Sequence, residues 1–394
     1  MTKPRRFHLA GDDEIKAGLV SDVYFRRAMA SMDAAGLDAE VVMEVRAGSL
    51  PGGWPWAVLV GCDEVAALFD GVPVDVDACA EGSVFHPGDP VMVVTGSYRA
   101  FGELETALLG MLCQASGVAT KAARCVAAAA GKPVFNFGAR RMHPGLAPLI
   151  ARSAYIGGCS GVATVAGAEA LGIQPVGTIP HALILVCGDM TRALTLFDKA
   201  MPAEVSRVAL VDTFCDEKIE ALAAAEALGD RLFAVRLDTP SSRRGDMAQI
   251  VREVRWELDL RGHGKVGIIA SGGLDEASIA ELADLCDGFG VGTCISNAPT
   301  VNFAMDIVVV DGAPLAKRGK WSGRKSLWRC SECLSSQVLP RGERPRPCPC
   351  GGAVEEALVP LVRKGSPVAE SEPPADIRSR VLAAVGAVAG PEPA

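Results

Sequence analysis

Aromatic residues are scarce in this chain of 394 residues, at 5% of the total, and no run of about 18 consecutive apolar residues occurs. Few aromatic rings disfavour the base-stacking platforms of single-strand nucleic-acid binders. The absence of a long apolar run disfavours a membrane span, and no early stretch combines a basic head, an apolar core and a small-residue cleavage site. The formal net charge of −8 argues against general nucleic-acid binding. We therefore expect a cytoplasmic protein with no membrane and no nucleic-acid partner.

The cysteine content does not indicate a secreted disulfide framework, because the thirteen cysteines are spread over a long chain. Nine of them lie in apolar or small-residue contexts that are typical of reduced core thiols. These nine are Cys62, Cys79, Cys113, Cys125, Cys159, Cys187, Cys215, Cys286 and Cys294. Apolar residues make up 49% of the sequence, which is enough for large cores, and the length predicts two or three domains.

Apolar runs and helix-length stretches alternate regularly between residues 207 and 293. The runs that predict strands are residues 208–211, 232–237 and 266–270, with a short strand near Phe289. The helix-length stretches are residues 216–228, 246–260 and 275–286. This alternation predicts parallel strands joined by crossover helices. Two further predicted strands, at residues 134–137 and 175–178, bring six strand ends to one incomplete α/β barrel.

The fold class predicted is α/β, with three further parts around the incomplete barrel. The first is a discontinuous α/β sandwich domain that opens with a helix at residues 12–32, and the second is a small zinc-ribbon-like module. The third is a Pro/Ala-rich tail that would be partly disordered around one helix at residues 376–388. The expected boundaries are 1–105 plus 300–325 for the sandwich, 106–299 for the barrel, 326–362 for the module and 363–394 for the tail.

Polar residues or glycines follow the predicted strands, where α/β architectures bind ligands. They are Asp212, Arg236-Leu-Asp238, Ser271-Gly272-Gly273 and Gly290-Val-Gly292-Thr293. The glycine turns would present backbone N–H groups to a phosphate. Arg236 and Asp238 are two residues apart, so both should point into the barrel. The pattern favours a phosphorylated-sugar site, although Asp212 could instead cap the following helix.

Several motifs occur in the order found in nicotinate phosphoribosyltransferases. They are Phe137-Gly-Ala-Arg140-Arg141, Gly177-Thr-Ile-Pro-His181, Val211-Asp-Thr213, Arg236-Leu-Asp238, Ser271-Gly-Gly273 and Gly290-Val-Gly-Thr293. The chain most resembles the archaeal-type branch, which has a cysteine-rich tail, over roughly residues 15 to 350. The resemblance implies transfer of phosphoribosyl from phosphoribosyl pyrophosphate (PRPP) to nicotinic acid, giving nicotinate mononucleotide and pyrophosphate. ATP would be a co-substrate whose hydrolysis assists the reaction.

The resemblance also implies roles for individual residues. Catalysis would involve His181, Arg236 and Asp238, and nicotinate would contact Tyr24, Phe137, Arg140 and Ser160. PRPP and its phosphates would contact Arg140, Arg141, Asp212, Asp238, Gly272, Gly273, Gly290, Gly292 and Thr293. The aspartates would bind the ribose hydroxyls or a Mg²⁺ on the pyrophosphate. Tyr24 would reach across a subunit interface, so a homodimer or higher homo-oligomer with its active site at that interface is expected.

His181 and Ser160 bear on coupling and on substrate choice. A lone histidine is often structural, but His181 follows a predicted strand and a proline turn, and the matching family histidine is phosphorylated by ATP. No Walker-type phosphate loop is present, so ATP would use the phosphoribosyl site. Relatives that use nicotinamide have an aspartate at the position aligned with Ser160. A neutral serine there would admit the acid.

Cys330-Ser-Glu-Cys333 and Cys348-Pro-Cys350 have the spacing of four thiolate ligands to a tetrahedral, structural Zn²⁺. The same region is basic, so a nucleic-acid-binding zinc-ribbon scaffold is a rival hypothesis. We expect a solvated cationic face instead, or one that contacts a neighbouring subunit. Quinolinate phosphoribosyltransferase is the alternative enzyme, because residues 140–146 also resemble its basic turn. That family does not require the segment Gly177–His181 or a zinc tail.

Overall fold

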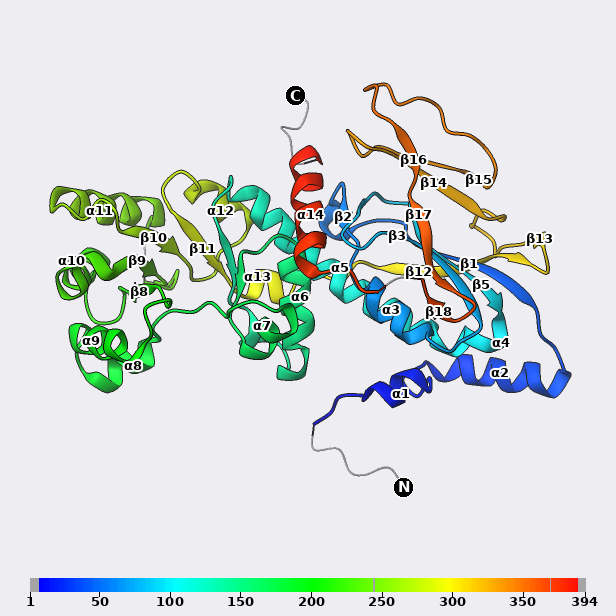
Figure 1. Cartoon of the computed structure of the whole chain (residues 1–394), viewed down its shortest axis with the longest axis horizontal. Helices are drawn as coiled ribbons and strands as arrows, with labels where there is room; N and C mark the ends of the chain where they lie inside the picture. Colours follow the sequence, from blue (N-terminus) through cyan, green and yellow to red (C-terminus); the bar gives the residue numbers. More distant parts are fainter. Residues whose placement is uncertain (1–6, 244, 369, 389–394) are drawn as a thin grey trace. The chain divides into compact units, whose positions relative to one another are not determined.

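A computed structural model gives the fold of the chain and describes residues 7–243, 245–368 and 370–388. The chain divides into two compact units (Figure 1). Unit 1 comprises residues 1–120 and 299–394, and unit 2 comprises residues 121–298. Among the residues within those described ranges, no helix is long and apolar enough to cross a membrane.

Unit 2 is built on a parallel sheet of six strands in the order β7-β6-β11-β10-β9-β8. Its strands are β6 (Val134–Asn136), β7 (Gly161–Val162), β8 (Arg207–Leu210), β9 (Leu232–Leu237), β10 (Gly267–Ala270) and β11 (Gly288–Val291). Its helices include α6 (Ala147–Ile156), α7 (Val165–Leu171), α8 (His181–Cys187), α9 (Met190–Ala200), α10 (Glu217–Leu228), α11 (Met247–Leu260), α12 (Glu276–Leu282) and α13 (Thr293–Ser296). The predicted α/β half-barrel is thus present.

Three of the crossover helices begin at aspartates, as the alternation predicted. The side chains of Asp216, Asp246 and Asp275 accept hydrogen bonds from backbone N–H groups in the first turns of α10, α11 and α12. Such caps each stabilise a helix by about 1 kcal/mol. Asp212 does not cap α10, because Asp216 occupies that position. The carboxylate of Asp212 therefore remains available for another role.

The predicted strand at residues 175–178 is wrong, and β7 (Gly161–Val162) holds the outer place in the sheet. Val176 donates one backbone hydrogen bond to the Val162 carbonyl, at 2.9 Å, but no ladder continues from it. Pro175 has no N–H group to donate, so the segment is poorly suited to a regular strand. The segment from Gly177 to His181 instead forms a connection that leads directly into α8.

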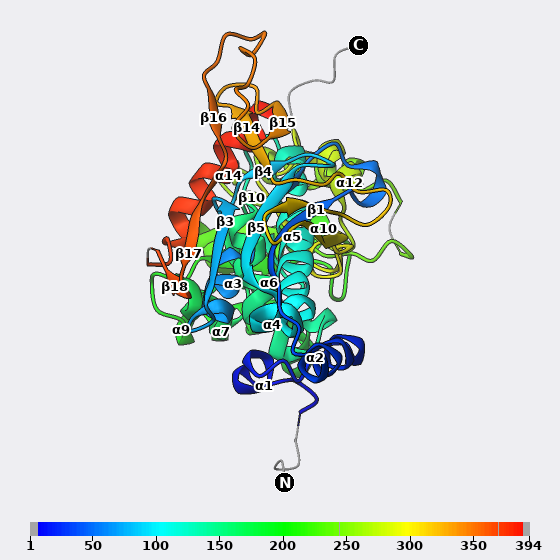
Figure 2. The same cartoon turned by 90° about the vertical axis from the view of Figure 1, so that its right-hand side faces the viewer.

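Unit 1 contains an antiparallel sheet in the order β13-β12-β1-β5-β3-β17-β18 (Figure 2). Its strands are β1 (Glu40–Ala47), β3 (Val74–Cys79), β5 (Pro90–Ser97), β12 (Phe303–Val310), β13 (Ala313–Pro314), β17 (Leu358–Arg363) and β18 (Ser366–Pro367). The chain returns to this sheet through β12, which pairs with β1. The long helix α5 (Glu105–Ala128) runs on from unit 1 into unit 2.

Two details of unit 1 differ from the sequence prediction. The helix expected at residues 12–32 is divided into α1 (Asp12–Lys16) and α2 (Val23–Ala35), because Gly18 takes a φ of +66° between them. The cysteine-rich region forms a three-stranded sheet that ends at Glu356, whereas β17, within the expected module, joins the larger sheet. Burial of the apolar Val362 explains why β17 belongs to the larger sheet.

Beyond β18, helix α14 (Pro374–Val388) packs on unit 1 through Ile377, Val381 and Val385, which are buried. A Cβ at Gly82 would lie 2.7 Å from the Ile377 side chain, so the helix fits closely against that turn. The expectation of a partly disordered tail also falls on residues 369 and 389–394, which lie outside the described residues.

Candidate active site

Five strands of unit 2 place chemically distinct residues at one rim. The residues directly after β6, β7, β9, β10 and β11 are Phe137, Ala163, Asp238, Ser271 and Gly292. A cavity of about 330 Å³ lies at this rim. It brings together ten predicted site residues: Phe137, Arg140, Arg141, Arg236, Asp238, Gly272, Gly273, Gly290, Gly292 and Thr293.

Arg236 is the most constrained side chain at the rim. Its Nε donates to Ser271 Oγ at 2.8 Å, its Nη1 donates to Thr178 Oγ1 at 2.9 Å, and its Nη2 lies 3.2 Å from Asp238 Oδ1. The guanidinium carbon lies 4.9 Å from the centroid of the Phe137 ring. The predicted pairing of Arg236 with Asp238 is therefore present. A guanidinium has five N–H groups, so two remain beyond these three contacts for a ligand.

Sequence reasoning missed the roles of Ser271 and Thr178. Ser271 is almost fully buried, and its hydroxyl accepts from Arg236 and donates to Asp238 Oδ1 at 2.7 Å. Thr178 holds the opposite edge of the guanidinium. Both residues stand inside motifs that were interpreted only through their glycines and histidine. The polar side chains next to those glycines and that histidine could have indicated these contacts in advance.

His181 is the first residue of α8 and lies between the two aspartates. Its Nε2 is 3.7 Å from Asp212 Oδ1 and 3.9 Å from Asp238 Oδ2, and its Nδ1 is 3.1 Å from Thr213 Oγ1. Asp212 Oδ1 is buried and has no hydrogen-bond partner among the described residues. Burial raises the pKa of Asp212 to about 6, with the charge of Asp238 adding to the rise and His181 opposing it. A desolvated carboxylate with one oxygen that accepts no hydrogen bond is typical of a ligand-binding group.

Gly272 and Gly273 form the turn after β10 with φ values of +88° and +78°, which only glycine adopts easily. A Cβ at Gly272 would also lie 2.9 Å from the Asp238 carbonyl oxygen. Gly290 has a different reason to be glycine. It lies within β11, and a Cβ there would lie 2.4 Å and 2.6 Å from two ring carbons of Phe137. Gly290 therefore makes room for the Phe137 ring.

Ser160 is not brought to the cavity. Its N–H donates to the carbonyl of Val134, the first residue of β6, and so it lies at the amino ends of the strands. The register of β6 with β7 pairs Asn136 with Val162, so Phe137 and Ala163 are the next residues along these two strands. The prediction that Ser160 lines the ring pocket does not fit this register. Tyr24 lies in unit 1, on α2, with 58% of its surface exposed.

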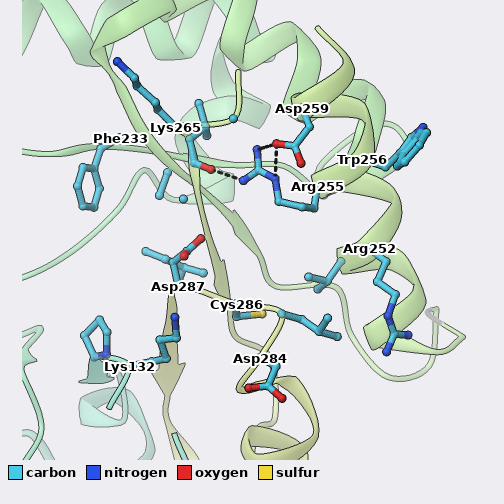
Figure 3. Close-up of a pocket in the computed structure, with 18 of the residues that line it drawn as sticks. Lys132, Phe233, Arg252, Arg255, Trp256, Asp259, Lys265, Asp284, Cys286 and Asp287 are labelled. Atoms are coloured by element: carbon cyan, nitrogen blue, oxygen red, sulfur yellow. Dashed lines mark hydrogen bonds and ion pairs between the residues drawn. The ribbon is translucent and has the colours of Figure 1, made fainter. Parts of the chain in front are cut away.

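A larger cavity, of about 790 Å³, opens at the opposite ends of the same strands (Figure 3). Its Arg255 is held by Asp259 and by the carbonyls of Val266 and His263. None of the buried polar atoms that lack a partner within the described ranges lines this cavity. Because ligands of α/β sheets bind at the carboxyl ends of strands, the smaller cavity is the better candidate.

The four cysteines of the C-terminal module come together. Their sulfur atoms all lie within 4.8 Å of one another, and Cys330–Cys350 and Cys333–Cys348 are each 3.4 Å apart. A tetrahedron of Zn–S bonds of about 2.3 Å has edges of about 3.8 Å, so this donor set fits a zinc ion. A Cβ at Gly352 would lie 2.6 Å from the Cys330 sulfur, so that glycine leaves the space which the sulfur occupies.

Five of the nine basic residues of the region 317–346 form ion pairs within unit 1. Their partners are four buried or largely buried carboxylates, which offset part of the charge available to a polyanion. The pairs are Lys317 and Lys320 with Asp306, Arg324 with Asp77, Lys325 with Glu44, and Arg329 with Asp89. The four others are Arg318, Arg341, Arg344 and Arg346. These ion pairs argue against the nucleic-acid scaffold.

Two family models match the chain in succession. Residues 22–116 match the N-terminal domain of quinolinate phosphoribosyl transferase, and residues 118–306 match its C-terminal domain. Nicotinate phosphoribosyltransferase pncB1 of Mycobacterium tuberculosis is 32% identical over 91% of this chain and 89% of its own length. The pncB2 protein of the same organism is 37% identical over 65% of this chain and 57% of its own length.

Solved structures are similar over nearly the whole chain. A nicotinate-nucleotide pyrophosphorylase from Pyrococcus furiosus is 52% identical, with a TM-score of 0.94, and the match covers 96% of this chain and 97% of that one. Human nicotinic acid phosphoribosyltransferase is 22% identical, with a TM-score of 0.77 over 95% and 94% of the two chains, and shows the fold alone. These likenesses confirm the mixed α/β fold with its parallel half-barrel sheet.

Proposed function

The chain belongs to the type II phosphoribosyltransferase family of quinolinate and nicotinate phosphoribosyltransferases, and from that premise we propose that it is a nicotinate phosphoribosyltransferase. It transfers phosphoribosyl from PRPP to nicotinic acid and releases nicotinate mononucleotide and pyrophosphate. One observation carries the proposal. The cavity at the strand ends combines an aromatic ring, Phe137, with the cations Arg140, Arg141 and Arg236. That combination suits a flat acid next to a phosphorylated sugar.

The reaction needs no protein nucleophile at the sugar. The ring nitrogen of nicotinate attacks the anomeric carbon of PRPP while the bond to pyrophosphate breaks. Phe137 stacks on the pyridine ring, Arg140 pairs with its carboxylate, and Arg236 stabilises charge on the leaving group. Gly272, Gly273, Gly290, Gly292, Thr293 and Arg141 surround the phosphates. Gly290 also makes room for the Phe137 ring, because a Cβ at this position would collide with the ring.

Asp212 and Asp238 suit the ribose hydroxyls or a Mg²⁺ that enters with PRPP. The buried, unpartnered Oδ1 of Asp212 fits either ligand. Mg²⁺ bound there would neutralise charge on the pyrophosphate. ATP acts as a co-substrate in the same phosphate-binding region and phosphorylates His181, which lies between the two aspartates.

His181→Ala is expected to abolish stimulation by ATP while slow transfer from PRPP continues. The histidine carries phosphate but does not activate the ring nitrogen, which is already nucleophilic. ATP helps only through its differential effect on the PRPP-binding state. Product formation with and without ATP, and acid-labile phosphate on the protein, measure the effect. If ATP stimulates the variant as it does the parent, the coupling role belongs to another residue.

We place the chain in the archaeal-type branch, with a structural Zn²⁺ held by Cys330, Cys333, Cys348 and Cys350. All four positions of a tetrahedral ion would be taken by sulfur, which leaves no position for a substrate. The ion would tie the small sheet of the C-terminal region together, because Cys330 and Cys333 lie where its first strand turns into the second, and Cys348 and Cys350 lie in the connection from the second strand to the third.

Cys333→Ser is expected to lower the melting temperature by about 5 °C or more and to leave kcat of the folded enzyme unchanged. Removing one thiolate weakens a site that stabilises only the folded module. Thermal unfolding and metal content are measured together, with Cys187→Ser as the control for loss of a free thiol. A selective loss of turnover in a folded, metal-free protein would show that the metal has a role in catalysis.

We also propose a homodimer or higher homo-oligomer in which Tyr24 of one copy completes the active site of another. The exposed ring of Tyr24 on α2 is consistent with such a contact. The expected division into sandwich, barrel, zinc module and tail also stands as a proposal, as does cytoplasmic localisation. Sedimentation of the intact protein, with and without PRPP, tests the oligomeric state.

The proposed function is tested by supplying PRPP with nicotinate, nicotinamide or quinolinate in separate reactions, each with and without ATP. Mononucleotide formation from nicotinate, stimulated by ATP, is the expected result. Product from quinolinate alone would favour the alternative enzyme, whose domain models match this chain. Quinolinate has a second carboxylate to neutralise, and Arg236 already contacts Asp238, which limits the cations available for it.

A further inference from the structure

Glu220 is a buried carboxylate that no sequence motif indicated. It lies in the first turn of α10 with only 3% of its surface exposed. Its Oε2 accepts from the N–H of Thr213 at 2.9 Å, and its Oε1 accepts from the N–H groups of Phe214 at 2.7 Å and Cys215 at 3.1 Å. Three consecutive backbone N–H groups thus converge on one side chain. Charge-assisted hydrogen bonds of this kind are stronger than neutral ones.

The segment that Glu220 holds is the loop after β8, which carries two contacts to His181. Asp212 lies near the start of the loop, with its Oδ1 3.7 Å from His181 Nε2. Thr213 follows, with its hydroxyl 3.1 Å from His181 Nδ1. The Phe214 side chain is half exposed, so hydrogen bonds to the backbone, more than packing of that ring, fix the loop. Glu220 therefore acts on the site through the backbone and not by touching the substrate.

We infer that Glu220 is a positioning residue that holds Asp212 and Thr213 in register with His181, an inference that rests on the proposed function. The bound loop presents Asp212 to the ribose or pyrophosphate side of PRPP and keeps the imidazole ring oriented for phosphorylation. The nicotinate side of the cavity, formed by Phe137 and Arg140, does not depend on this loop. Loss of Glu220 should therefore affect PRPP and ATP but spare nicotinate.

Glu220→Gln is the direct test, because the amide has nearly the same shape but only one acceptor oxygen and no charge. We expect the KM for PRPP to rise about tenfold and the KM for nicotinate to change less than about twofold. The yield of acid-labile phosphate on His181 should fall with it. Hydrogen exchange of the amides of residues 213–215 should become faster, since their acceptor is weakened.

Two control variants lie on the same helix. Glu226→Gln makes the same chemical change at an exposed position and should alter none of these quantities. Leu228→Ala removes a buried side chain from the other end of α10 and should lower the melting temperature. It should not raise the KM for PRPP more than the KM for nicotinate. If Glu220→Gln fails to fold, Thr213→Val tests the same link from the loop and should lower phosphorylation of His181.

Unchanged exchange at residues 213–215, or an unchanged KM for PRPP in folded Glu220→Gln, would overturn the inference. The inference would also be overturned if Leu228→Ala raised the KM for PRPP but not the KM for nicotinate, because a general loss of stability would then explain the effect. A parent protein that forms no mononucleotide would instead refute the proposed function. In that case the exchange measurement still decides whether Glu220 fixes the loop, and unchanged exchange rejects it.

Discussion

Ala163→Asp is expected to raise the KM for nicotinate about a hundredfold while the KM for PRPP stays within about twofold of the parent value. Ala163 is the first residue after β7, and Phe137, the proposed platform for the pyridine ring, is the first residue after the paired strand β6. An added carboxylate would face the carboxylate of the substrate. At a separation of about 5 Å and an effective dielectric constant of about 20, the repulsion is about 3 kcal/mol.

Ser160→Asp is the matched control for this prediction. It adds the same charge three residues earlier, at the amino end of the sheet, where Ser160 bonds to the Val134 carbonyl. We expect little change in either KM, and we expect nicotinamide, which has no negative charge, to be used by Ala163→Asp at least as well as by the parent. The opposite pattern, with the large loss in Ser160→Asp, would show that the strand register at this edge is different.

Local signals predicted most of the half-barrel. The alternation of apolar and polar segments located β8, β9, β10 and β11, and the aspartates at 216, 246 and 275 marked the starts of three helices. These features depend on residues close together in the sequence, which explains why they could be recognised there. The pairing of Arg236 with Asp238 was also accessible, because alternation along one strand puts both side chains on the same face.

Features that depend on contacts between distant segments were not accessible. β7 has only two residues, so it contains no apolar run from which a strand could be predicted. The extended segment near Val176 was predicted as the strand instead. Arg236 contacts Thr178, 58 residues away, and no local pattern encodes that contact. Glu220 looked like an ordinary helix residue, since its three partners lie in the loop before α10.

Gly290→Ala is expected to lower kcat/KM about a hundredfold and to destabilise the fold by about 1 to 3 kcal/mol. The added methyl group would lie 2.4 Å from one carbon of the Phe137 ring and 3.2 Å from Ser271 Cβ. Since β11 lies inside the sheet, the ring must move instead of the strand. Movement of the ring would also displace Arg236, which stacks on it, and so disturb the contacts of Arg236 with Ser271 and Asp238.

Gly288→Ala is the control in the same strand, because no atom lies closer than 3.3 Å to its added Cβ and Gly288 lies outside the cavity. Steady-state kinetics and thermal unfolding are measured for both variants and for the double variant Gly290→Ala/Phe137→Ala. The double variant should regain stability but not turnover, because the clash is relieved while the platform for the pyridine ring is gone.

A loss in Gly290→Ala confined to the KM for PRPP would assign Gly290 to the phosphate loop, as its motif first indicated. A loss in the use of nicotinate would show instead that Gly290 makes room for the Phe137 ring, which is the result that we expect from the geometry.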